Sequence, residues 1–306
     1  MARQRRKTTK KENKKASESN ETEATEVMTA AEGRKRRKTT RKDNKKVSES
    51  NETEATEGTT AAEDPKWPLF YKQPVPLSME RHGGKSINLQ RRFGFAKASN
   101  MVPVNMPEFS RVATSYPIVF TETAPASSIA ILGLRQSQNL FVNDEGTWDG
   151  GVYVPAYVRR YPFIFSAGQE EEQLVLCVDE ADELIVDGAG DENTQPIYDG
   201  EEASEVVKKM LEFCTAFHRQ SLATREFVDE LETRELFRPG TVTISNESGE
   251  KFNLRGFRIV DEAKFNALPD DAFLEFRRKG WLQAVTAHLI SIQNLATLGF
   301  RSKSAE

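Results

Sequence analysis

The first 64 residues contain no aromatic side chain and few aliphatic ones. They hold 17 Lys and Arg and 13 Asp and Glu, whereas residues 65–306 hold 26 and 34 together with all 18 Phe, 6 Tyr and 3 Trp. A segment with so little apolar surface cannot offset the conformational entropy that it loses on ordering. We therefore predict a disordered, charged tail over residues 1–64 and a globular domain over residues 65–306, folded as one unit or as two tightly packed subdomains.

Cysteine and histidine, the usual nucleophile, base and metal ligand, are also scarce. Cys177 and Cys214 lie in apolar surroundings, which predicts buried free thiols with no disulfide between them. Neither cysteine has a base near it in the sequence, and no serine lies in a G-x-S-x-G turn. None of the three histidines lies in an H-E-x-x-H motif or beside a cysteine at metal-ligand spacing. We predict no catalytic residue, no metal site and no cofactor.

Long apolar runs are missing as well. No segment approaches the roughly 18 consecutive apolar residues of a membrane helix. The N-terminus is basic but is followed by no apolar region, so it does not have the pattern of a secretory signal. These observations predict a protein with no transmembrane segment and a cytoplasmic address.

The charged tail is an internal duplication. The segment Arg5–Glu32 recurs as Arg36–Glu63 at a spacing of 31 residues, and each copy runs from a basic block to an acidic one. Two copies without an apolar face cannot stack into a core, so we interpret the tail as a polyampholyte arm. One hypothesis is that its basic blocks contact a polyanion such as nucleic acid, anionic lipid or a cell-surface polymer. The alternative is a solubilising arm without a dedicated partner.

The pattern of residues 65–306 predicts an α+β domain with a mixed or antiparallel β-sheet core, a long helix and C-terminal helices. Most of the strands come first in the chain and most of the helices later. The predicted strands span 117–123, 128–134, 139–143, 163–167 and 173–180, followed by a loop over 187–200 and a hairpin whose turn is 246–250. The predicted helices span 201–236, a segment capped by Asp261, 270–279, and 281–298.

The best candidate for a binding site is the segment Asn139–Phe163, which combines aromatic residues, glycine turns and two adjacent arginines. Arg159 and Arg160, with Tyr157 and Tyr161, have the chemistry to recognise a carboxylate, a phosphate or a glycan. The alternative is that both arginines form internal ion pairs and that both tyrosines fill the edge of the core.

His288 is a second candidate, since an anionic substrate site would need a titratable group beside the arginines. It lies on the apolar stripe of the last predicted helix. The alternative for this residue is a core histidine that forms internal hydrogen bonds.

Several segments of the domain resemble the bacterial SapC family in order and spacing. They are PLFYKQPVPLSMERH, YPIVFTE, AILGLRQSQNLFV, YVPAYVRRYPF, LCVDEADELI, LEFCTAFHRQSLATREFVDEL, LRGFRIVDEAKFNALPDDAF and GWLQAVTAHLISIQNL. The resemblance runs from about Lys66 to Leu298 and leaves out the tail. It implies a surface-layer or envelope-associated accessory protein of a Gram-negative bacterium, and it brings no catalytic residues with it.

Two hypotheses follow for the function. The first is a non-enzymatic interaction protein that binds a protein or an envelope polymer. The second is an enzyme, or an enzyme accessory, that acts on a small anionic substrate.

Overall fold

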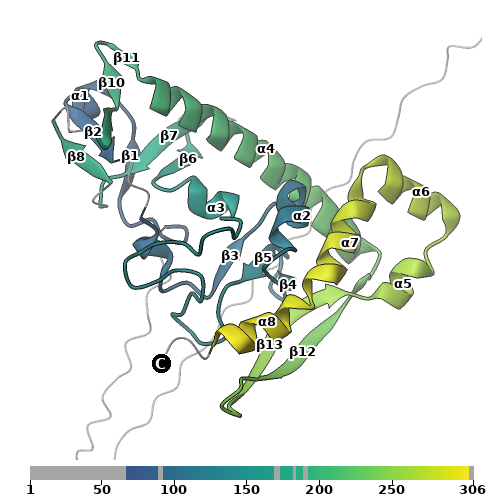
Figure 1. Ribbon diagram of the computed structural model, residues 1–306. Coiled ribbons are helices and arrows are strands. Elements are labelled where there is room, and N and C mark those ends of the chain that lie inside the picture. Colours follow the sequence, from purple (N-terminus) through teal and green to yellow (C-terminus); the bar gives the residue numbers. More distant parts are fainter. Residues whose placement is uncertain (1–66, 89–91, 169–172, 182–183, 189–191, 303–306) are drawn as a thin grey trace, which may run out of the picture. The chain divides into compact units, whose positions relative to one another are not determined.

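The computed structural model describes residues 67–88, 92–168, 173–181, 184–188 and 192–302 (Figure 1). The predicted disorder of residues 1–64 lies outside this part of the chain. The described residues confirm the predicted α+β class, with antiparallel sheets, one long helix and a C-terminal group of helices. Of the helices described, none is both long enough and apolar enough to cross a membrane.

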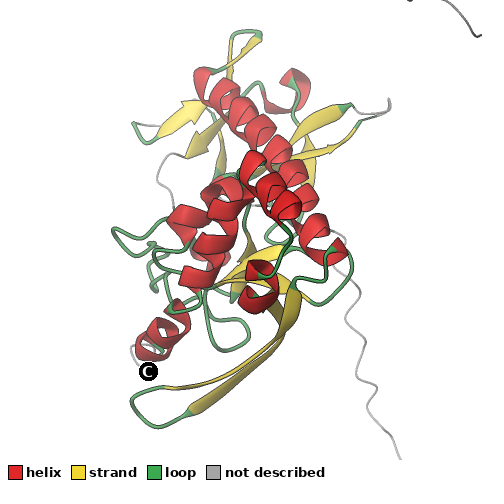
Figure 2. Cartoon of the chain, turned by 90° about the vertical axis from the view of Figure 1, so that its right-hand side faces the viewer, coloured by secondary structure: helices red, strands yellow, loops and turns green. Residues whose placement is uncertain are grey.

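The largest sheet has five antiparallel strands in the order β12-β13-β4-β5-β3. Its strands are β12 (Phe237–Ser245), β13 (Lys251–Val260), β4 (Ile118–Thr121), β5 (Ser128–Ile131) and β3 (Met101–Pro103). Strands β12 and β13 form the predicted hairpin, the long pair of strands in Figure 2. In its turn Gly249 has a φ of 84°, a conformation that glycine adopts without steric cost.

Three smaller sheets come from the first half of the domain and the segment before the long helix. They are β1 (Pro74–Pro76), β7 (Leu174–Asp179) and β6 (Phe163–Ala167); β8 (Ile185–Asp187), β2 (Lys85–Asn88) and β9 (Thr194–Pro196); and β10 (Tyr198–Asp199) with β11 (Glu202–Ala203). The predicted loop over 187–200 is therefore wrong, because β9 and β10 both lie within it. The pairing partner of β9 is β2, about a hundred residues away, so the local sequence carries no alternating pattern to reveal it. Strand β10 pairs with β11, which follows a few residues later.

Strand β7 departs from its prediction in burial. The alternation of Leu174, Leu176 and Val178 with Val175 and Cys177 predicts a strand that is buried on both faces. In the structure Leu174 is exposed, and only Cys177, Val178 and Asp179 are buried. The second half of the strand is therefore fully buried, whereas Leu176 in the first half packs against the core as a half-buried side chain.

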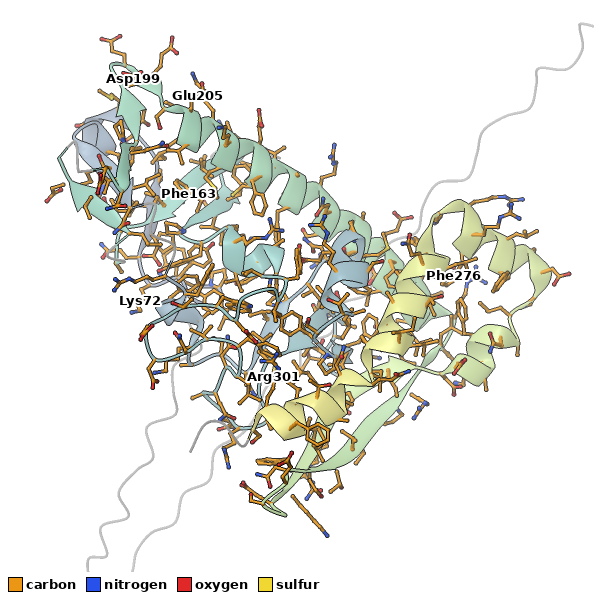
Figure 3. All side chains as sticks on the ribbon, in the orientation of Figure 1. Lys72, Phe163, Asp199, Glu205, Phe276 and Arg301 are labelled. Carbon is orange, nitrogen blue, oxygen red and sulfur yellow. The ribbon has the colours of Figure 1, made fainter. Side chains whose placement is uncertain are left out.

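The long helix α4 (Glu205–Thr233) was predicted from its apolar periodicity, and its 29 residues correspond to roughly 44 Å. Its first half packs on β6 and β7 through Val207 and Cys214, and its second half packs on the large sheet through Phe227 and Leu231. In Figure 3 Phe163 marks the first of these cores and Phe276 the second. The middle of α4 thus lies where the two cores meet.

The C-terminal helices are α5 (Glu262–Asn266), α6 (Asp270–Arg278), α7 (Trp281–Ser291) and α8 (Asn294–Arg301). Asp261 caps α5 as predicted, and its carboxylate accepts hydrogen bonds from the amides of Ala263 and Lys264. The prediction of a single helix over 281–298 is wrong, because α7 ends at Ser291 and a second helix, α8, begins at Asn294. The hydroxyl of Ser291 donates to the carbonyl of His288, a local bond that competes with helix continuation.

The predicted strand over 139–143 is also wrong, since this segment contributes only an isolated bridge between Val142 and Trp148. The side chain of Asn139 donates to the carbonyl of Ala96 and accepts from the amide of Phe141, which folds the segment into a loop. The remaining short helices are α1 (Met79–His82), η1 (Gly94–Ala96), η2 (Met106–Glu108), α2 (Phe109–Val112) and α3 (Ala156–Arg159).

Candidate functional site

The two adjacent arginines lie at the end of the short helix α3. Pro155 precedes this helix and Pro162 follows it, so the helix is confined to a single turn. Successive side chains on a helix point roughly 100° apart. Arg159 and Arg160 accordingly line two different cavities along the middle of α4, and Phe217 of α4 lines both.

The first cavity, which we call the Arg159 cavity, has a volume of about 370 Å³. The side chains that give it its chemistry are Glu108, Arg111, Tyr153, Arg159, Phe213 and Gln220. Arg159 donates to the carbonyl of Val154 at 3.0 Å and to the hydroxyl of Tyr153 at 2.8 Å. The guanidinium groups of Arg111 and Arg159 lie 5.7 and 5.3 Å from the centre of the Tyr153 ring. Two cations therefore share one aromatic ring at this cavity.

Glu108 is the acidic member of this cavity and is 6% exposed. Its Oε1 accepts from the amide of Asn105, and its Oε2 accepts from the amide of Ala156 and the hydroxyl of Tyr153. Burial raises the pKa of this carboxyl, against the opposing effect of these donors and of Arg159. Both carboxylate oxygens thus accept hydrogen bonds, and these bonds hold α3 against the start of η2.

The second cavity, which we call the Arg160 cavity, has a volume of about 230 Å³. Its wall contains Arg160, Phe165, Cys214, Phe217, His218 and Ser221. Cys214, His218 and Ser221 lie on one stripe of α4, because residues four and seven apart share a helix face. Arg160 therefore faces a thiol, an imidazole and a hydroxyl across one small cavity.

Three aromatic rings surround the guanidinium of Arg160. Its central carbon lies 4.2 Å from the ring centre of Tyr157, 4.5 Å from that of Phe217 and 5.6 Å from that of Tyr71. Its Nε is buried without a hydrogen-bond partner. Within the described part of the chain, no carboxylate lies within ion-pair distance of Arg159 or Arg160. The internal ion pairs that the alternative interpretation predicts for these two arginines are therefore absent from the described part of the chain.

The two predicted tyrosines differ in their relation to the arginines. Tyr157 forms one wall around Arg160 and donates its hydroxyl proton to the carbonyl of Leu69. Tyr161 is buried against Phe95 and Tyr71, with ring centres 4.2 and 5.2 Å away, and its hydroxyl lies 3.4 Å from Asp179. The structure thus brings Tyr157 into contact with an arginine and places Tyr161 in the core.

His288 lies apart from the other predicted site residues, between α7 and the large sheet. It is fully buried, its Nδ1 donates to the carbonyl of Ile118 at 2.8 Å, and its Nε2 accepts from the amide of Val260 at 3.0 Å. Burial lowers the pKa of the imidazole to about 4, and the nearby charge of Arg238 acts in the same direction. A neutral histidine with both nitrogens occupied serves the packing of the core and has no free nitrogen for a ligand.

Several residues of both cavities were not predicted as site residues from the sequence. Glu108 has a local signal, since an Asn followed three residues later by Glu is a capping-box pattern. No local sequence pattern indicates that Cys214 and His218 lie near Arg160, because Cys214 follows Arg160 by 54 positions. Both cysteines are free and buried, as predicted. No group of three or more potential metal ligands occurs among the residues that the structure describes.

The comparisons with known proteins point to one family. The model of the SapC family matches residues 77–298, which contain the Arg159 cavity, the Arg160 cavity apart from Pro68, and the three largest elements of the domain. No curated protein and no solved structure matches the chain significantly.

Proposed function

The chain belongs to the SapC family, and from this premise we propose that it is a non-enzymatic accessory protein of the surface layer or cell envelope. In this proposal the domain binds an acidic group of an envelope partner, either a protein or a polymer, in the Arg159 cavity. The basic blocks of the tail add a salt-dependent attachment to a polyanion.

The observation that carries the proposal is the charge of the Arg159 cavity. Arg111 and Arg159 bring two positive charges, whereas Glu108 brings one negative charge whose oxygens already accept three hydrogen bonds. The cavity is therefore cationic in a segment, residues 65–306, with a formal charge of −8. Such a local reversal of sign favours an anionic partner and orients its approach.

The second hypothesis, an enzyme on a small anionic substrate, is favoured by the Arg160 cavity, where an arginine meets Cys214 and His218. A cysteine nucleophile must be a thiolate near neutral pH. Burial raises the pKa of Cys214 to about 11 even though the charge of Arg160 opposes this shift. The thiol is thus protonated at neutral pH, and we prefer the binding function.

The proposal predicts that loss of positive charge at the Arg159 cavity weakens binding to the envelope. We expect Arg111→Gln and Arg159→Gln each to reduce the affinity of the full-length protein for isolated host envelopes about tenfold, since each removes a charge-assisted hydrogen bond. Co-sedimentation over a range of protein concentrations measures this affinity. The side chain of Arg111 is exposed and forms no hydrogen bond within the described residues, and its carbonyl still accepts from Thr114 in the variant, so the replacement leaves the fold intact.

Arg219→Gln is the matched control, because Arg219 is an exposed arginine of α4 outside both cavities. It changes the net charge by the same amount as the Arg111 and Arg159 variants, and we expect its affinity to stay within twofold of the wild type. Equal losses in all three variants would show that net charge alone governs binding, and the Arg159 cavity would then have no specific role.

A further inference from the structure

We propose that the Arg160 cavity is a binding site for a small monocarboxylate with an apolar body. This site is separate from the Arg159 cavity, and it does not depend on the proposed envelope partner. Three features of the site support it: the environment of the guanidinium, the size of the cavity and the composition of its wall.

The guanidinium of Arg160 is held by rings that cannot neutralise it. Tyr71 and Tyr157 donate their hydroxyl protons to the carbonyls of Phe163 and Leu69. Burial raises the pKa of both tyrosines, so both stay neutral despite the neighbouring positive charge. Aromatic faces stabilise the cation but accept none of its in-plane hydrogen bonds. The hydroxyl oxygens of Tyr71 and Tyr157 can accept from the guanidinium, but its buried Nε has no acceptor. Among the described residues no carboxylate supplies a counter-charge.

The cavity supplies the space for such an acceptor. At about 230 Å³ it is smaller than the roughly 300–1,000 Å³ of sites for drug-sized ligands. Pro68, Ile164, Phe165 and Phe217 give it an apolar wall, whereas Cys214, His218 and Ser221 are the polar members opposite Arg160. These proportions suit a molecule with one polar end and a short aromatic or aliphatic body.

A carboxylate fits this arginine better than a phosphate. The planar guanidinium offers parallel N–H donors that match the two oxygens of a carboxylate. Arg160 is the one arginine or lysine in the cavity wall as the structure describes it, so it balances a single negative charge. A phosphate group carries a charge of about −1.5 to −2 at neutral pH and would leave part of that charge unpaired away from water.

Benzoate and butanoate are suitable probes, with benzamide as the neutral analogue of benzoate and inorganic phosphate as the anion without an apolar body. Their binding to the full-length protein is measured by isothermal titration calorimetry. In parallel, the alkylation of Cys214 by N-ethylmaleimide is followed by mass spectrometry. Cys177 is the internal control, since it is equally buried but lies outside this cavity.

We expect at least one carboxylate to bind and to slow the alkylation of Cys214 at least fivefold, with Cys177 unaffected and with no effect of benzamide or phosphate. Arg160→Gln should reduce the affinity at least tenfold, whereas Arg219→Gln, at an exposed position of α4 outside both cavities, should leave it unchanged. Ser221→Leu is the second variant, which tests the site even if Arg160→Gln fails to fold. Its larger side chain narrows the cavity and leaves Arg160 in place, so we expect it to prevent binding.

The inference is overturned if neither carboxylate binds, if benzamide binds as tightly as benzoate, or if Arg219→Gln weakens binding as much as Arg160→Gln. It is also overturned if a bound carboxylate leaves Cys214 as reactive as before. The envelope assay of the Arg111 and Arg159 variants is independent of these results, so either proposal can fail without the other.

Discussion

Replacing Glu108 with alanine is expected to destabilise the domain by about 3–5 kcal/mol, because it leaves three donors unpaired in a buried place. These donors are the amides of Asn105 and Ala156 and the hydroxyl of Tyr153. The same change removes the link between η2 and α3, which positions both arginines. Urea unfolding of the wild type and the variant measures the difference in the free energy of unfolding.

Two further substitutions make this test specific. Glu108→Gln keeps one acceptor oxygen but turns an amide group toward a donor, so we expect a loss of about 1–2 kcal/mol. Glu212→Ala removes an exposed carboxylate of α4 and should change stability by less than about 0.5 kcal/mol. A loss for Glu108→Ala no greater than that for Glu212→Ala would contradict the role assigned to this carboxylate.

The second large effect concerns His288 and depends on pH. The pKa of the buried imidazole is lowered to about 4 from an ordinary value of 6.5. The stability that the neutral ring contributes is therefore fully present above pH 6.5 and is lost as the pH falls toward 4. A shift of this size corresponds to about 3 kcal/mol of unfolding free energy.

We expect His288→Ala to destabilise the domain by about 3 kcal/mol at pH 7.5, since it opens a cavity and leaves the amide of Val260 without its acceptor. The variant has no imidazole to protonate, so its deficit relative to the wild type should shrink at pH 4.5. Chemical unfolding of both proteins at the two pH values gives this comparison. A deficit that is equal at both values would mean that His288 is not held neutral by the fold.

Local signals predicted the elements that depend on neighbouring residues. The hairpin of β12 and β13 follows from alternating residues around a turn, and the start of α5 follows from the side chain of Asp261. The long helix α4 follows from its apolar period. In each case the residues that interact are close together in the sequence, so a local sequence pattern is enough to predict the element.

The wrong predictions involve contacts between distant segments or side chains that bind the local backbone. Strand β9 exists because β2 pairs with it, and the break after α7 coincides with a hydroxyl bond of Ser291 that periodicity does not report. The arginine pair was identified from sequence, but its division between two cavities was not. That division depends on where α4 lies against α3, a tertiary relation that residue types alone do not encode.

The central claim, association with the cell envelope, is tested most directly by fractionating the native host at low and at high salt. The protein is followed with an antibody, in parallel with a chain that lacks residues 1–64. We predict recovery of the full-length protein in the envelope fraction, release by high salt, and a weaker and less salt-dependent association without the tail. Recovery of the full-length protein in the soluble fraction at both salt concentrations would contradict the claim and favour an enzyme or enzyme accessory that acts on a small anionic substrate.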